Sequence, residues 1–350
     1  MIQSKTILKA LPKVLKTINI PSLGKKYQGK VRDIYLKDDK RILITTDRQS
    51  AFDVILGCIP FKGTVLNLLS KFWFEKTRHI IANHMVSVPD SNVMVTRNCR
   101  PTSIEMIVRG YMTGVTKTSI WYSYQKGERI IYGIKFPDGM KKNQKLDRPV
   151  LTPTTHPEVG SKLHDERLTR DEILRNKIVD KKIFLQMEEA ALKLFEFGSS
   201  WCRKKGLILV DTKYEFGIYD GKLMLIDEIH TPDSSRFWTR DSYDRIFSAD
   251  YKDGEPQTRL TSSRGLRPRV GGASVRGEPE NFDKEFLRLW YADKGYRGDG
   301  KPPAMSKQLI VDLAKRYIGV YEKITGTKFK AYKYPITDRI KKNIEKAIKL

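Results

Sequence analysis

The sequence predicts an α+β fold in which antiparallel β-hairpins are combined with longer helical segments. Residues 31–46 and 207–229 each show two apolar runs on either side of a short polar turn, which is typical of a β-hairpin. Residues 64–83, 171–206 and 306–350 carry apolar side chains at helical spacing. The chain has 350 residues and no internal repeat, so it is long enough for one large domain or two of ordinary size.

The N-terminal elements follow from local patterns. The first hairpin joins strands at 31–36 and 42–46 through a Lys-Asp-Asp-Lys turn, and a helix is expected at 64–83. Residues 103–110 are expected to form a strand that enters a glycine-flanked turn, and residues 116–127 a short helix that stops at a glycine.

The C-terminal elements are more helical. The stretch 171–206 is helical through its middle and is expected to end near Gly198 or Gly206. The second hairpin follows at 207–229, and the periodic tail 306–350 is expected to be helical.

One segment differs from the rest in composition. Residues 252–281 contain no aromatic side chain and are rich in Arg, Gly, Ser and Pro. Such a stretch buries too little apolar surface to offset the entropy lost on ordering. We therefore expect a mobile insertion at this point.

Charge and cysteine content limit the partners and the compartment. The net charge is +25, which favours anionic partners without choosing among nucleotides, phosphorylated metabolites, nucleic acid and acidic membranes. The three cysteines form no C-x-x-C pair, so neither a disulfide framework nor a zinc ribbon is indicated. No apolar run approaches ~18 residues, and the basic start lacks an uninterrupted apolar core, so we expect no membrane span and no secretory signal. These features favour a cytoplasmic protein.

The second hairpin carries the most suggestive chemistry. Asp211, Lys213 and Glu215 alternate along its first strand, so they share one face. Asp227 joins them if the turn has three residues, but lies on the other face if only residues 220–221 form the loop. We favour the three-residue loop, because the shorter one places ionised groups on both faces. Two carboxylates and a lysine suit Mg²⁺ and phosphate, although a solvated strand face explains this hairpin alone equally well.

The turn around Gly29 is a candidate phosphate site. Gly29 allows backbone N–H groups to approach phosphates, and Lys30 and Arg32 supply positive charge. The pattern is not a Walker A motif, and a glycine hairpin that covers ATP is closer. Taken alone, an ordinary basic hairpin explains it better.

Two further stretches combine arginine with hydroxyl groups. Arg109 ends a strand before glycines and the hydroxyl side chains of Thr116, Thr118 and Ser119, and Ser234 and Arg236 lie in a second such stretch. Helix N-termini and arginine forks bind phosphate, although simple helix capping explains each stretch separately. Together the two stretches flank the carboxylates. This arrangement suits transfer between a metal-bound nucleotide and a second anionic substrate.

Seven sequence blocks resemble one enzyme family. They are GKVRDIY, TDRQSAFD, VRGYMTG, LTPTTHPEVGSKLHDE, LVDTKYEFG, DEIHTPDSSRFW and DKEFLRLWY, and they run from Gly29 to Tyr291 in family order. In these blocks the chain resembles the SAICAR synthetases of purine synthesis.

The resemblance implies a fold and a reaction. The fold is an antiparallel-sheet N-terminal domain with the glycine hairpin, residues 1–108, and an ATP-binding α+β domain with C-terminal helices, residues 109–350, similar to protein kinase and ATP-grasp lobes. The reaction joins L-aspartate to a carboxylated aminoimidazole ribonucleotide (CAIR), with ATP and Mg²⁺, and gives SAICAR, ADP and phosphate. Phosphorylation to an acyl phosphate makes the poorly electrophilic carboxylate open to attack by the aspartate amine.

The resemblance also implies roles for individual residues. Those that cover the ATP phosphates or lie near the adenine are Gly29, Lys30, Val31, Arg32, Glu105 and Met106. The catalytic group comprises Lys213, Glu215, Asp227 and Arg236, of which Glu215 and Asp227 hold Mg²⁺. Residues that take the ribonucleotide phosphate are Arg109, Ser234, Ser235 and Arg236. Residues that lie around the substrates are Asp47, Asp53, His164 and Asp165.

This chain departs from the family pattern at one position. It has Val115 where some members have serine, so the phosphate contacts there fall to Thr116, Thr118 or backbone N–H groups. The Arg-Gly segment 255–278 matches no family block.

Two other classes of protein share part of the pattern. A small-molecule or protein kinase would share the glycine hairpin and the metal acids, but the H-R-D and D-F-G blocks are missing. A nucleic-acid-binding protein would share the charge, but the basic residues are spread along the chain and form no known module. We expect small-molecule substrates, with no membrane and no specific nucleic-acid partner. The oligomeric state stays open.

Overall fold

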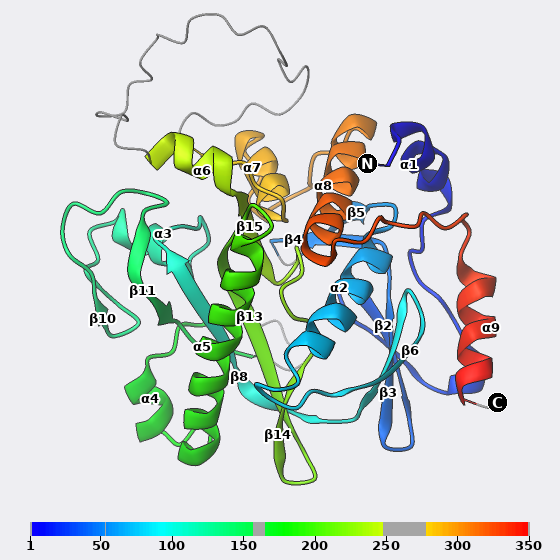
Figure 1. Cartoon of the computed structure of the whole chain (residues 1–350), viewed down its shortest axis with the longest axis horizontal. Coiled ribbons are helices and arrows are strands. Elements are labelled where there is room, and N and C mark those ends of the chain that lie inside the picture. Colours follow the sequence, from blue (N-terminus) through cyan, green and yellow to red (C-terminus); the bar gives the residue numbers. More distant parts are fainter. Residues whose placement is uncertain (1, 53, 157–164, 248–277, 349–350) are drawn as a thin grey trace, which may run out of the picture.

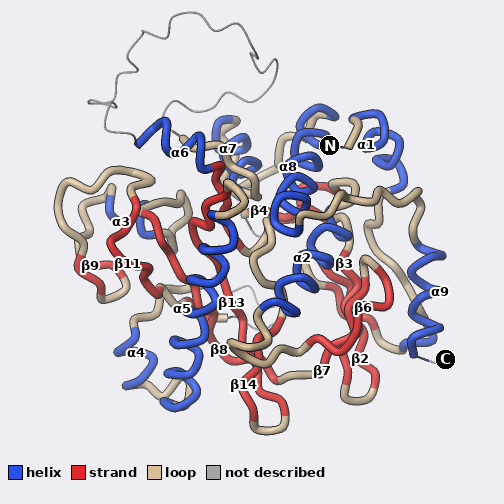
Figure 2. Tube along the Cα trace, viewed as in Figure 1, coloured by secondary structure: helices blue, strands red, loops and turns tan. Residues whose placement is uncertain are grey.

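The computed structural model describes residues 2–52, 54–156, 165–247 and 278–348. Within these ranges two large antiparallel sheets are covered by helices, and Figures 1 and 2 show the strands gathered into two groups. The α+β fold class predicted from the sequence is confirmed.

The first sheet has the strand order β1-β2-β3-β7-β6. Its strands are β1 Lys26–Gln28, β2 Arg32–Lys37, β3 Lys40–Thr45, β6 Met85–Asp90 and β7 Val93–Arg97. The predicted first hairpin is β2–β3, closed by Asp38 and Asp39, with Asp38 at φ 54°. A second hairpin, β1–β2, carries the turn at Gly29.

The second sheet contains the predicted catalytic strands. Its path is β11-β8-β13-β14, with β12 added to β8 and β15 added to β13. The strands are β8 Arg100–Tyr111, β11 Lys145–Leu151, β12 Thr154–Thr155, β13 Leu207–Tyr219, β14 Lys222–Ile226 and β15 Ser235–Thr239. The long strand β13 therefore has β8 on one side. On its other side it pairs first with β15 and then with β14.

The loop of the β13–β14 hairpin contradicts the predicted register. Tyr219 pairs with Lys222, so the loop contains only Asp220 and Gly221, at φ 50° and 69°. Two residues at positive φ form the turn that best matches strand twist, and Asp-Gly favours it. The three-residue loop was wrong. Asp227 nevertheless influences Glu215 electrostatically, because β14 ends at Ile226 and Asp227 itself adopts φ 62°, which turns its side chain out of the strand alternation.

The predicted helix at 171–206 is divided in two. These helices are α4 Arg170–Arg175 and α5 Lys181–Arg203. A capping box at Thr169 starts the first, and the Asp180 carboxylate accepts from two backbone N–H groups to start the second. Helix α5 ends near Gly206 rather than Gly198. It lies along β8 and β13 and buries its apolar side on them (Figure 1).

Helix α2, Lys62–Lys76, is shorter than the predicted segment 64–83. The hydroxyl of Thr77 donates to the Trp73 carbonyl at 2.7 Å and the chain then turns. The side-chain amide of Asn83 returns to the Phe74 carbonyl at 3.0 Å, so the last predicted turns are replaced by a loop.

The remaining elements frame the two sheets. The short strands are β4 Arg48–Ala51, β5 Val54–Cys58, β9 Ile130–Ile131 and β10 Ile134–Lys135. The other helices are α1 Ser4–Ala10, α3 Ile120–Tyr124, α6 Arg240–Phe247, α7 Glu285–Asp293, α8 Lys307–Thr325 and α9 Thr337–Ile348. Helix α3 stops before Gly127, as predicted, and the helical tail consists of α8 and α9.

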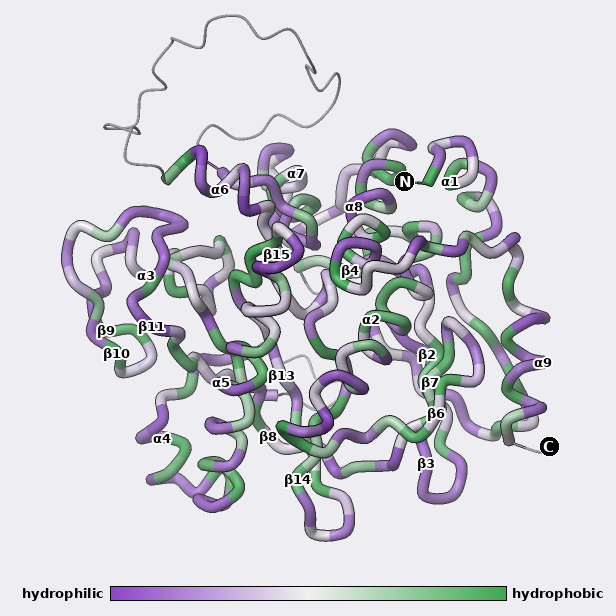
Figure 3. Tube along the Cα trace, in the orientation of Figure 1, coloured by the Kyte–Doolittle hydropathy of each residue, from purple (hydrophilic) through white to green (hydrophobic). Residues whose placement is uncertain are grey.

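One hydrophobic core joins both sheets to helices α2, α5 and α8. Figure 3 shows hydrophobic and hydrophilic residues interleaved along α9, whose Ile340 and Ile344 are fully buried at a spacing of one turn. The division predicted after residue 108 falls inside β8, whose whole length belongs to the second sheet. We therefore propose a domain boundary between β7 and β8. None of the described helices is both long and apolar enough to span a bilayer.

Most of the predicted insertion, residues 252–277, lies outside the described residues. Its predicted end at residue 281 is wrong, because residues 278–281 are part of the folded protein. Glu278 accepts from the Asn143 side chain at 2.9 Å, and buried Asn281 accepts from the Trp238 indole at 3.0 Å.

Candidate active site

Three charged residues form a row across β8, β13 and β15. Asp211 lies directly opposite Arg109 on one side and Arg236 on the other. Its Oδ2 atom accepts from Arg109 Nη1 at 3.3 Å and from Arg236 Nη1 at 2.5 Å, and all three side chains are buried. The sequence placed Asp211 on this face, but it did not show that this carboxylate holds the two predicted phosphate arginines together.

Arg236 has a second acidic neighbour in α7. Its Nε atom lies 3.3 Å from Glu285 Oε2, an ion-pair distance that does not meet hydrogen-bond geometry. The guanidinium also lines a small hollow with Gly114, at φ 100°, and Val115. A Cβ atom at Gly114 would lie 2.4 Å from the Ser119 Cβ, so glycine is required there. The hollow thus brings Arg236 of the second predicted stretch beside the glycine turn that follows Arg109.

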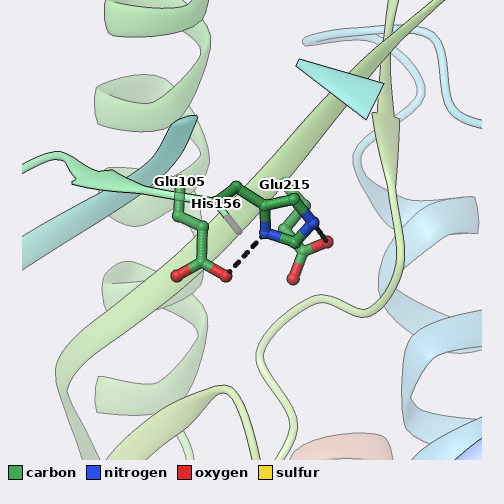
Figure 4. A group of neighbouring side chains, drawn as sticks. All are labelled: Glu105, His156 and Glu215. Atoms are coloured by element: carbon green, nitrogen blue, oxygen red, sulfur yellow. Dashed lines mark hydrogen bonds and ion pairs between the residues drawn. The ribbon is translucent and has the colours of Figure 1, made fainter. Parts of the chain in front are cut away.

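A second row of charges lies further along the same face. Glu105 of β8 and Glu215 of β13 are directly opposite each other, and Lys213 Nζ lies 2.5 Å from one carboxylate oxygen of each. His156, just after β12, places Nδ1 3.0 Å from Glu105 Oε1 and Nε2 3.9 Å from Glu215 Oε2 (Figure 4). The cluster therefore alternates acid and base across two strands.

The pKa values of the two acids in this cluster, Glu105 and Glu215, are shifted in opposite directions. Burial raises the pKa of Glu215 to about 7; Lys213 opposes this shift, and the negative charges of Asp227 and Glu105 add to it. Burial acts in the same direction on Glu105, but Lys213 and His156 outweigh it and lower that pKa to about 2. The hydrogen bond to Glu105 raises the pKa of His156. Glu215 is thus the acid that gains most from an added cation.

Asp227 and Glu228 face an arginine from the first sheet. Arg32 Nη1 lies 2.5 Å from Asp227 Oδ1, and Arg32 Nη2 lies 3.2 Å from Glu228 Oε2. Burial opposes the charge on Arg32, but the two acids outweigh it and raise the pKa of this guanidinium. Arg32 therefore links the glycine hairpin to Asp227, one of the two predicted metal ligands. Glu228 was not predicted as a site residue, although it follows Asp227 directly.

Arg48 stabilises the glycine turn through hydrogen bonds to its backbone. The Gly29 N–H donates to the Arg32 carbonyl at 2.8 Å and closes the turn. Arg48, which is 4% exposed, donates to the carbonyls of Gly29 at 2.9 Å and Lys30 at 3.2 Å. The sequence did not single out Arg48, although it belongs to the quoted block TDRQSAFD. Val31 packs its half-buried side chain against the core.

Several predicted residues lie elsewhere. Met106 is fully buried in the core on the face opposite Glu105, so its side chain does not reach the cluster. Asp47 is also fully buried. Its carboxylate accepts from the Leu15 N–H at 2.9 Å, the Gly63 N–H at 3.2 Å and the Tyr334 hydroxyl at 2.9 Å. These contacts anchor the Asp47 carboxylate in the folded core, and its predicted place around the substrates stays a prediction.

The remaining predicted residues are near the edge of the site or outside the described ranges. Ser234 Oγ accepts from the Thr231 N–H at 3.2 Å, and Ser235 donates to Thr212 Oγ1 at 2.7 Å. Asp165 is exposed at the start of a described range. Asp53 and His164 lie outside the described residues.

The fit to a metal ion can be judged from the donors. Within the described part of the chain, Glu105, His156 and Glu215 place donor atoms within 4.8 Å of one another (Figure 4). Mg²⁺ prefers oxygen ligands, which Glu215 and Asp227 supply, whereas the imidazole of His156 suits softer metals. The neighbouring negative charges that raise the pKa of Glu215 also favour a dication. By the type of its ligand atoms, the predicted pair Glu215 and Asp227 suits Mg²⁺.

Comparison with known proteins identifies the family. A sequence model described as SAICAR synthetase matches residues 25–256. The chain belongs to the SAICAR synthetase family. A phosphoribosylaminoimidazole-succinocarboxamide synthase of Legionella pneumophila (strain Paris) is 46% identical over 96% of this chain and 99% of its own length. The resemblance of the seven blocks to SAICAR synthetases is thereby confirmed.

Solved structures of SAICAR synthetases share the fold. A SAICAR synthase of Saccharomyces cerevisiae, complexed with SAICAR, matches with a TM-score of 0.70 and 28% identity over 90% of this chain and 99% of that one. A SAICAR synthetase in complex with ADP matches with a TM-score of 0.60 and 22% identity over 87% of this chain and 100% of that one.

Proposed function

We propose that this chain joins L-aspartate to CAIR with cleavage of ATP, and yields SAICAR, ADP and phosphate. The observation that carries the proposal is the pair of charge rows on one face of the second sheet. The row Arg109–Asp211–Arg236 suits a phosphate monoester, and the row around Lys213 suits a reacting carboxylate beside a metal-bound nucleotide. Membership of the SAICAR synthetase family supports the same reaction.

The chemistry requires activation of a carboxylate. A carboxylate oxygen of CAIR attacks the γ-phosphorus of ATP, the bond to the β–γ bridging oxygen breaks, and ADP leaves. The aspartate amine, after losing a proton, then attacks the acyl carbon and expels inorganic phosphate. This sequence replaces hydroxide, a poor leaving group, with phosphate.

Lys213 has the position needed to hold the reacting carboxylate. Its ammonium lies between Glu105 and Glu215 and remains charged, because these acids raise its pKa against the effect of burial. A fixed cation lowers the repulsion between the substrate carboxylate and the phosphates of ATP. Mg²⁺, held by Glu215 and Asp227, would neutralise charge on the transferred phosphoryl group.

The phosphate of the ribonucleotide is assigned to Arg109 and Arg236. Asp211 fixes both guanidinium groups in one plane of the sheet, so neither needs to reorganise on binding. The Gly29–Arg32 turn is assigned to the phosphates of ATP, with Glu105 near the adenine. We place the reaction in the cytoplasm, as the cysteine usage of the sequence favours.

An omission series tests the proposal. ADP release is measured with the complete mixture and with CAIR, L-aspartate or Mg²⁺ left out in turn. The proposal predicts that all three are required and that the product has the mass of SAICAR. ADP release that is complete without aspartate and yields only a phosphorylated substrate would instead identify a kinase.

A further inference from the structure

Lys284, immediately before α7, is a partly buried cation with distant partners. Its Nζ atom lies 3.9 Å from Asp233 Oδ2 and 3.4 Å from Ser50 Oγ, and 14% of its side-chain surface is exposed. Among the described residues, Asp233 is the one carboxylate within ion-pair distance of this ammonium. The contact is long for a charge-assisted hydrogen bond, which normally spans ~2.7–2.9 Å.

Asp233 is already engaged by closer donors. Its Oδ2 atom accepts from Lys62 Nζ at 2.7 Å, and its Oδ1 atom accepts from the Tyr317 hydroxyl at 2.6 Å. Burial lowers the pKa of Lys284 to about 8; Asp233 opposes this shift, while Arg288 and Lys62 reinforce it. The surroundings therefore do not balance the charge of Lys284, and an incoming anion would.

Lys284 is next to segments of both parts of the proposed site, the metal acids and the phosphate row. Its backbone N–H donates to the Pro232 carbonyl at 3.2 Å, within the loop that follows the acids Asp227 and Glu228. The next residue, Glu285, pairs with Arg236 of the phosphate row. Lys284 thus adjoins the loop after the proposed metal acids through its backbone, and the phosphate row through its neighbour Glu285.

We propose that Lys284, with the Ser50 hydroxyl, binds a carboxylate of L-aspartate. This inference rests on the proposed function. ATP is assigned to the Gly29–Arg32 turn, and two anionic groups of CAIR already have cations: its phosphate at Arg109 and Arg236, and its reacting carboxylate at Lys213. The dicarboxylic amino acid still lacks a cation, and Lys284 is a cation whose nearest carboxylate, Asp233, lies closer to Lys62.

The test compares Lys284→Gln with Lys294→Gln, a matched change of an exposed lysine at the other end of α7. Loss of a charged contact predicts a KM for L-aspartate raised by about tenfold or more in Lys284→Gln. The KM values for ATP and CAIR should change by less than about threefold, because the lost contact is made to aspartate alone. Lys294→Gln should match the wild type in all three. An unchanged KM for L-aspartate in folded Lys284→Gln overturns the proposal.

Thermal unfolding separates binding from structure. A lysine that mainly stabilises the fold through Asp233 would lower Tm when replaced and leave the KM for aspartate unchanged, which also contradicts the proposal. Removal of an under-paired buried charge should instead leave Tm unchanged or raise it.

A second measurement uses the wild-type protein in case the variant does not fold. Acetic anhydride labels reactive amines, and mass mapping of the peptides reports the labelling of Lys284 with and without saturating succinate, a dicarboxylate probe. The proposal predicts protection of Lys284 and none of Lys294. Equal labelling with and without succinate overturns it. Failure of the wild type to require aspartate would overturn the proposed function itself, which the omission series reports separately.

Discussion

Replacement of Arg236 by alanine tests the phosphate row most sharply. Two consequences are expected, one for binding and one for stability. In the phosphate site a bidentate, charge-assisted contact is lost, which should cost about 1.5–3 kcal/mol, or about one to two decades in the KM for CAIR. The KM for ATP should change little, because the nucleotide is assigned to the Gly29–Arg32 turn.

The stability loss follows from the acids left behind. Asp211 loses its contact at 2.5 Å but keeps Arg109 at 3.3 Å, and Glu285 keeps Arg288 at 3.1 Å. Breaking a buried pair costs about 3–5 kcal/mol, and the remaining partners favour the lower end of that range. Urea unfolding should therefore show a decrease of about 3 kcal/mol while the protein remains folded at 25 °C.

Initial-rate kinetics with each substrate varied in turn provide the assay. Arg240→Ala is the matched control, because Arg240 follows β15 directly and forms an exposed ion pair with Asp244 at 3.2 Å. This control should leave the KM values unchanged. A raised KM for ATP in Arg236→Ala, with the KM for CAIR unaltered, would refute the assignment and exchange the two phosphate sites.

Other variants test the remaining parts of the site. Asp227→Asn should abolish turnover while the fold is retained, because the metal site loses one negatively charged ligand. Near-normal turnover at saturating Mg²⁺ would show that Asp227 does not have this role. Because the folded pKa of Glu215 is raised to about 7, its contribution to stability is largest at low pH and is lost as pH rises toward 7. The Tm of Glu215→Gln measured without metal should accordingly fall less between pH 5 and 8 than that of the wild type, and an equal fall would contradict the shift. Arg48→Lys should raise the KM for ATP by about tenfold, because one ammonium cannot replace a guanidinium that holds the carbonyls of both Gly29 and Lys30; an unchanged KM would show that the turn needs no such support.

The sequence predicted the elements whose signals are local. Alternation along β13 correctly placed Asp211, Lys213 and Glu215 on one face, and the Lys-Asp-Asp-Lys turn located the β2–β3 hairpin. The site acids on neighbouring strands could not be found this way. Glu105 faces Glu215 because β8 pairs with β13 across a sequence separation that no local pattern reports.

Asp227 acts electrostatically on Glu215, although the loop from which its position was predicted is wrong. The predicted three-residue loop brought it to the catalytic face, whereas the actual loop of two residues would send it to the other face by alternation. Asp227 has a positive φ, so the chain turns there, and the alternation of side chains along a strand does not predict such a turn. His156 and Arg48 were missed for a related reason. Their partners are the side chain of Glu105 and the carbonyls of the glycine turn, which are fixed by tertiary packing.

Transfer of oxygen from substrate to phosphate tests the central claim most directly. CAIR labelled with ¹⁸O in both oxygens of the reacting carboxylate is converted with unlabelled ATP in unlabelled water, and the inorganic phosphate is examined by mass spectrometry. If the carboxylate attacks the γ-phosphorus and phosphate then leaves the acyl carbon, each phosphate released carries one ¹⁸O atom and the amide of the product retains the other. Phosphate without ¹⁸O would show that ATP is cleaved by water and would contradict the acyl phosphate.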